Sequence, residues 1–126
     1  MAYIRYNANP ADKLVGDCVI RAISLLIDKE WDWVFSNLVA VAFEMKDMPS
    51  SNAVWSTFLS NLGYIREPMP NTCPVCYTVS DFCNDNIEGK YLLSTDGHVV
   101  TVINGHYYDT WDSGLEVPIY FWYKGE

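Results

Sequence analysis

The chain has 126 residues, of which half are hydrophobic and 15% are aromatic, and its formal net charge is −8 at pH 7. This length and composition predict a single folded domain spanning residues 1–126 and exclude a disordered chain. The negative charge argues against direct nucleic-acid binding, which needs clustered Lys and Arg, and no apolar run reaches the ~18 residues of a membrane-spanning helix. The acidic surface leaves open a basic partner or mimicry of nucleic acid, although a solvated acidic surface is the simpler interpretation.

The N-terminal residues carry no hydrophobic core of a secretion signal. We therefore expect a cytoplasmic protein whose four cysteines, Cys18, Cys73, Cys76 and Cys83, are thiols rather than a disulfide framework.

The first half of the chain predicts an arm followed by helices. Asp17 is a suitable N-cap, Gly63 suits the position just after a helix, and apolar residues recur at helical spacing between them. In the second predicted helix the apolar stripe includes Phe35 and Met45, which we expect to face the core. The expected elements are an irregular or extended arm over residues 1–15 and helices from Asp17 to Asp28, from Glu30 to Met45 and from Ser50 or Ser51 to Leu62.

The second half predicts mostly strands. A proline-bearing connector over residues 64–74 leads to a short helix that Thr78 and Asp81 can cap reciprocally. The expected strands are a short extended piece over residues 64–66, then 91–95, the two arms of a hairpin around residues 99–109, and 117–123. Helices followed by an antiparallel sheet are typical of an α+β fold.

The hairpin turn is Asn104-Gly105, which suits a two-residue turn with positive φ at both positions and fixes the strand register. The implied pairs are Ile103 with His106, Thr101 with Tyr108, Val100 with Asp109 and His98 with Trp111. Because paired residues point to the same face, His98 and Asp109 should lie on a diagonal within side-chain reach. Asp112 has the opposite parity and is the alternative acid only if a bulge or the strand end redirects it.

Cys18 lies in the first turn of the first predicted helix, where unpaired backbone N–H groups and the helix dipole favour a thiolate. Arg21 could add positive charge there, although an ordinary pair with Asp17 one turn earlier is the simpler role. Together Cys18, His98 and Asp109 form a candidate nucleophile, general base and orienting acid.

This order of residues resembles the papain-like cysteine peptidase fold, in which a Cys heads the first core helix and a His begins a later strand. The run Asp109-Thr110-Trp111 resembles the Asn-Ser-Trp run that carries papain's third catalytic residue. The Cys-His-Asp version is similar to that of bacteriocin-processing and related bacterial papain-like peptidases. The resemblance implies a papain-like thiol hydrolase of peptide, acyl or isopeptide bonds.

The whole chain also resembles a group of small uncharacterised proteins from phages and mobile elements of Gram-positive bacteria. The shared motifs are Gly-Asp-Cys-Val-Ile-Arg-Ala and Gly-His-Val-Val followed by Tyr-Asp-Thr-Trp-Asp-Ser. This likeness implies a location in the bacterial host cell. It keeps open a second hypothesis, a catalytically silent papain-fold protein that binds a host factor.

One departure from the papain pattern concerns the oxyanion. Papain-like enzymes usually carry a Gln several residues before the Cys, and this chain contains no Gln. Asn9 or Asn7 could replace it, with the Cys18 backbone N–H as the second donor, although turn formation explains both Asn residues equally well.

A second candidate site is Cys73-Pro-Val-Cys76 with Cys83, whose spacing permits a zinc knuckle, with His106 as a fourth ligand. A redox role for Cys73 and Cys76 is also open. A proline-bearing loop with partly buried thiols is the simpler interpretation, so we expect no metal and no cofactor.

Overall fold

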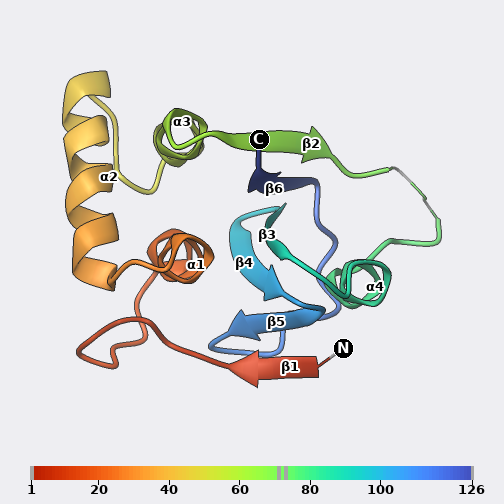
Figure 1. The fold of residues 1–126 in the computed structure, drawn as a ribbon. Coiled ribbons are helices and arrows are strands. Elements are labelled where there is room, and N and C mark those ends of the chain that lie inside the picture. Colours follow the sequence, from red (N-terminus) through yellow and green to blue (C-terminus); the bar gives the residue numbers. More distant parts are fainter. Residues whose placement is uncertain (1, 71, 73, 126) are drawn as a thin grey trace.

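The computed structural model describes residues 2–70, 72 and 74–125. It has helices towards the N-terminus and a six-stranded, mostly antiparallel sheet, which confirms the predicted α+β class (Figure 1). The elements are β1 (Ala2–Arg5), α1 (Cys18–Ile27), α2 (Trp31–Met45), α3 (Asn52–Asn61), β2 (Tyr64–Pro68), α4 (Val79–Asp85), β3 (Lys90–Thr95), β4 (His98–Ile103), β5 (His106–Asp109) and β6 (Tyr120–Lys124). The strand order in the sheet is β1-β5-β4-β3-β6-β2.

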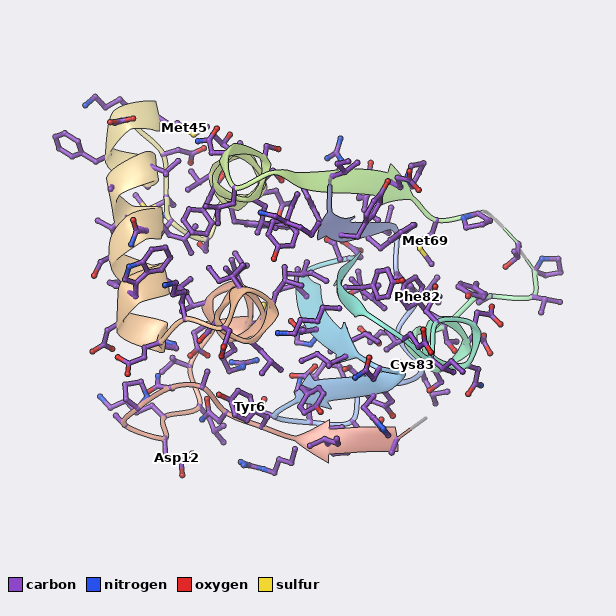
Figure 2. All side chains as sticks on the ribbon, viewed as in Figure 1. Tyr6, Asp12, Met45, Met69, Phe82 and Cys83 are labelled. Carbon is purple, nitrogen blue, oxygen red and sulfur yellow. The ribbon has the colours of Figure 1, made fainter. Side chains whose placement is uncertain are left out.

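Helices cover both faces of the sheet (Figure 1). The sheet therefore separates two hydrophobic clusters, one on each face. The larger cluster joins α1, α2 and α3 to one face, on which Leu92 and Trp122 lie. The smaller cluster joins α4 to the other face through Phe82 and Cys83, which project from α4 beside the strands (Figure 2). Adjacent residues of one strand face opposite sides, so Leu92 and Leu93 belong to different clusters.

Helix α2 packs on α1 and α3 and lies outside them, away from the sheet (Figure 1). Only a narrow stripe of it is therefore buried, including Val34 and Leu38. The prediction that Phe35 and Met45 face the core is wrong, since they are 40% and 39% exposed. Phe35 instead stacks on Trp31, with ring centroids 5.0 Å apart.

The predicted hairpin is confirmed at its turn and in its register. Asn104 and Gly105 have φ values of 50° and 79°, as a two-residue turn of this type requires. The ladder pairs Ile103 with His106 and Thr101 with Tyr108, as predicted, and ends before the predicted pairs Val100–Asp109 and His98–Trp111. The turn thus determines which residue of β5 lies opposite each residue of β4.

Two strands differ from the predictions. Residues 2–5 of the predicted arm form β1, which pairs in parallel with β5 and places Arg5 opposite Asp109. The last strand begins at Tyr120, later than predicted, after Pro118, which has no backbone N–H to donate to a ladder.

Helix α4 carries the predicted capping box between Thr78 and Asp81. No helix within the described residues is long and apolar enough to cross a membrane.

Candidate active site

Cys18 is the first residue of α1 and is half-buried beside the larger cluster. Asp17 occupies the N-cap position as predicted, but its side chain makes no capping hydrogen bond. The free N–H groups at this helix end therefore remain a source of positive potential for the Cys18 sulfur.

His98 begins β4 and Asp109 ends β5, so the two side chains meet at one end of the sheet. The His98 Nε2 atom lies 2.6 Å from Asp109 Oδ2. This contact is the diagonal that the register predicts. With Nε2 turned to the carboxylate, Nδ1 is the ring nitrogen that remains for the thiol, and Cys18 and His98 line the same two hollows.

The surroundings of Cys18 favour its thiolate. Burial acts to raise the pKa of Cys18, but hydrogen bonds with His98 and the Val99 backbone, and the positive charges of His98 and Arg21, outweigh it. The net effect lowers the pKa of Cys18 below its usual value. A lowered thiol pKa is what a nucleophilic cysteine requires.

His98 shows the complementary change. Burial disfavours the charged ring, but hydrogen bonds to Asp109 and Cys18 and the negative charges of both outweigh burial and raise the pKa of His98 to about 9. Because each partner stabilises the charged form of the other, their proximity favours the thiolate–imidazolium pair.

Asp109 is held by several groups besides His98 and is only 3% exposed. Its Oδ1 atom accepts from the Thr110 backbone N–H at 2.8 Å, and its Oδ2 atom accepts from the buried Ser113 hydroxyl at 2.7 Å. The Arg21 Nη2 atom lies 3.6 Å from Oδ1. These contacts fix the carboxylate that orients the imidazole, and no sequence pattern predicted the hydrogen bond from Ser113.

Arg21 links the helix that carries the nucleophile to the strand that carries the acid. It pairs with Asp17 one turn earlier, as predicted, and also faces Asp109. Asp17 in turn accepts from the Trp31 indole N–H at 2.9 Å, which explains why its carboxylate does not cap α1. The buried Arg21 guanidinium lies between the buried carboxylates of Asp17 and Asp109 and ties α1 to β5.

Two hollows flank the Cys18–His98 pair, with volumes of about 280 and 330 Å³. Both are lined by Gly16 and Gly97 as well as by Cys18 and His98. A Cβ atom added at Gly16 or Gly97 would meet no atom within 4 Å, so both glycines border open space. Cys18 and His98 thus line both hollows, which together are called the groove below.

Trp111 borders the larger of these hollows and lies against His98, with ring centroids 4.9 Å apart. It is 46% exposed, so one part of the indole faces solvent while another part covers the imidazole. Covering the ring limits water access to the His98–Asp109 pair and so strengthens its hydrogen bond.

Asp112, the alternative acid, lies elsewhere. Its carboxylate accepts from the Tyr107 hydroxyl and from the Gly114 backbone N–H. The Tyr107 and Gly114 hydrogen bonds lower the pKa of Asp112. His98 is therefore served by Asp109, in keeping with strand parity.

The two predicted oxyanion donors are engaged within the N-terminal loop. The Asn7 amide donates to Asp12 and to the Lys13 carbonyl, and the Asn9 amide donates to Asp17. Neither Asn7 nor Asn9 lines the two hollows beside Cys18.

Asn52, which the sequence did not single out, does line the smaller hollow with Cys18. Its carbonyl oxygen accepts from the Trp55 indole N–H at 3.0 Å. That bond fixes the amide and leaves its NH₂ group to act as a donor.

The second candidate site falls partly outside the described residues, because Cys73 is not among them. Cys76 is an exposed thiol and Cys83 a buried one. Among the residues that are described, no three His, Cys, Asp or Glu side chains lie close enough to hold a metal ion. His106, the predicted fourth ligand, is half-buried beside the hairpin turn, and its Nδ1 atom is buried without a hydrogen-bond partner.

The chain matches no family model, no curated protein and no solved structure.

The arrangement of Cys18, His98 and Asp109 can hold a thiolate at a helix N-terminus, move a proton through His98 and keep the imidazole oriented by Asp109.

Proposed function

We propose that the protein is a thiol hydrolase with a papain-like fold, acting on a peptide or on a related acyl or isopeptide bond. Cys18 is the nucleophile, His98 the general base and acid, and Asp109 the residue that orients the imidazole. The observation that carries the proposal is the 2.6 Å contact of His98 with Asp109, beside the groove that His98 lines together with Cys18.

The reaction begins when the Cys18 thiolate attacks the substrate carbonyl carbon, forming a C–S bond while the carbonyl electron pair moves to oxygen. The tetrahedral species then collapses, the leaving group departs with a proton from His98, and a thioester remains on Cys18. Water attacks the thioester, His98 takes the proton of that water, and the product acid and the Cys18 thiolate are released.

The negative oxygen of the tetrahedral species needs donors. The Cys18 backbone N–H is one, since the first N–H groups of a helix have no intrahelical partner. We assign the second to the Asn52 amide, because it borders the same hollow as Cys18 whereas the amides of Asn7 and Asn9 are engaged elsewhere.

The fold proposal rests on the position of each group. Cys18 begins the first helix, His98 begins a strand, and Asp109 lies at the end of the next strand, followed by a Trp against the His ring. This is the papain-like order. We also propose that the substrate is a peptide or protein and that the protein acts in the cytoplasm of a bacterial host.

Acyl transfer to Cys18 tests the function directly. The protein is mixed with p-nitrophenyl acetate, and intact-mass and peptide mass spectrometry follow acetyl groups on each cysteine. We expect a burst of p-nitrophenol equal to the amount of protein, an acetyl group on Cys18, and then steady turnover as water hydrolyses the thioester.

The matched control is Cys18→Ala, which retains the other three thiols and should show no burst. Acetylation of Cys18 without turnover would favour the catalytically silent binding protein. Equal acetylation of all accessible cysteines would contradict a dedicated nucleophile.

A further inference from the structure

A third hollow, of about 140 Å³, extends the groove beyond Cys18. It shares Asn52 and Gly97 with the smaller hollow beside Cys18, and the strand residues Ser94 and Thr95 line both. The two spaces therefore adjoin. The third hollow lies between the first turns of α3 and the strands β3, β6 and β2.

Its most distinctive side chain is Arg66, which projects from β2 over the ring of Tyr120, 4.5 Å from the ring centroid. Within the described part of the chain Arg66 makes no ion pair. Stacking on a ring holds a guanidinium in place while its N–H groups stay free to bind a carboxylate in a bidentate manner.

Trp122 also lines this hollow. Trp122 is 3% exposed, and its indole N–H is buried without a hydrogen bond. The neighbouring Trp55 differs, because its indole N–H donates to Asn52 at 3.0 Å. The Trp122 N–H is not open to a ligand, but Trp122 lines the hollow, so its resonance can report when the hollow is filled.

We propose that this hollow is a specificity subsite for a carboxylate-bearing side chain of the substrate, held by Arg66, whose guanidinium is already stacked on Tyr120. The inference rests on the proposed function and names a substrate class for it, a chain with Glu or Asp near the bond that is cut. Asp96 also borders the hollow and confines the carboxylate to the Arg66 side by repulsion.

Strand geometry gives the position of that acidic residue. Tyr120 pairs with Ser94, and Ser94 pairs with Val99, the neighbour of His98, so the Arg66–Tyr120 stack lies two strands from the catalytic strand. Two strand spacings are about 10 Å, which roughly three residues of extended chain can cover. The acidic residue should therefore lie about three positions from the reacting carbonyl.

The test uses peptides of Ala and Ser with a central dehydroalanine, an electrophile that a thiolate attacks at its β-carbon. One flanking position at a time carries Glu or its neutral isostere Gln, and the scan covers both sides of the electrophile. We expect Glu to speed labelling of Cys18 roughly three- to tenfold over Gln at a position about three residues away.

Two variants of the hollow sharpen the result, with iodoacetamide as the reference reagent. Arg66→Gln should remove the preference for Glu, Asp96→Asn should increase it, and Arg5→Gln, an exposed arginine on β1, should leave it unchanged. None of the three should alter the rate with iodoacetamide. Equal rates for Glu and Gln at every position, or a preference that survives Arg66→Gln, would overturn the subsite.

A binding measurement separates this inference from the proposed function. In Cys18→Ala, the indole N–H resonance of Trp122 should shift when the Glu peptide is added and stay in place with the Gln peptide. A shift without any reactivity of Cys18 in the native chain would retain the carboxylate site and reject the hydrolase. A reactive Cys18 without that shift would retain the hydrolase and reject the carboxylate site.

Discussion

Cys18 and Cys83 both lie on helices and both adjoin a hydrophobic cluster, yet their surroundings affect the thiol in opposite ways. Cys83 lies within α4 and is fully buried, and burial raises its pKa to about 11. Cys18 is also partly buried, but hydrogen bonds with His98 and the Val99 backbone and nearby positive charge outweigh burial and lower its pKa.

The comparison shows that position on the helix and the partners of the sulfur decide the chemistry of a cysteine here. Cys83 lies past the first turn of its helix, where the backbone N–H groups are used by the helix itself. Cys18 begins its helix and faces a ring that a buried carboxylate orients. An apolar neighbourhood alone would have produced two inert thiols.

The largest expected effect is the difference in alkylation rate between the two thiols in the native protein. At pH 7 a thiol with a pKa of about 11 is about 0.01% thiolate. We expect iodoacetamide to modify Cys18 at least about a hundredfold faster than Cys83. Peptide mass spectrometry over a time course measures both rates in one sample.

The exposed Cys76 thiol gives the alkylation rate of a solvent-accessible cysteine without an activating partner. Labelling in urea should show that Cys83 reacts once the protein is unfolded. Similar native rates for Cys18 and Cys83 would remove the contrast on which the nucleophile assignment rests.

Arg21→Met is expected to have the next largest effect, because it leaves the buried Asp17 carboxylate without a cation and removes one of the two cations beside Asp109. Breaking a buried ion pair in this way should lower the free energy of unfolding by about 3 kcal/mol. Urea denaturation followed by tryptophan fluorescence measures the change. Arg5→Met, at an exposed arginine, is the matched control and should stay within about 0.5 kcal/mol of the native protein.

Ser113→Ala should have a smaller effect, since it removes one neutral donor to a carboxylate that retains other partners. We expect a loss of about 1 kcal/mol in the free energy of unfolding. Ser60→Ala, at an exposed serine of α3, provides the baseline in the same urea titration. A Ser113 variant as stable as the Ser60 variant would show that Asp109 does not depend on this hydroxyl.

Local signals in the sequence predicted much of the fold. Asn104-Gly105 determined the hairpin register, and the reciprocal cap of Thr78 and Asp81 located α4. Long-range features were less accessible. The parallel pairing of β1 with β5 joins chain segments about a hundred residues apart, and the exposure of Phe35 depends on α2 lying outside the other helices. Hydrophobic periodicity gives the apolar face of a helix and not how much of that face another element covers.

The same division applies to the candidate site. Strand parity brought His98 to Asp109 because both lie on one hairpin, and the helix start drew attention to Cys18. The role of Ser113 depends on how the chain turns back after β5, and the place of Asn52 depends on how α3 packs near α1. No local pattern encodes either arrangement, so the sequence pointed to Asn7 and Asn9 instead.

The central claim is that His98 activates Cys18, and the pH dependence of Cys18 alkylation tests it most directly. In the native protein the rate with iodoacetamide should remain high well below the ordinary thiol pKa of about 9, because the imidazolium stabilises the thiolate. In His98→Ala the rate at pH 7 should fall about tenfold and rise again only with the titration of an ordinary thiol. Superimposable profiles for the two proteins, both rising near pH 9, would contradict the account.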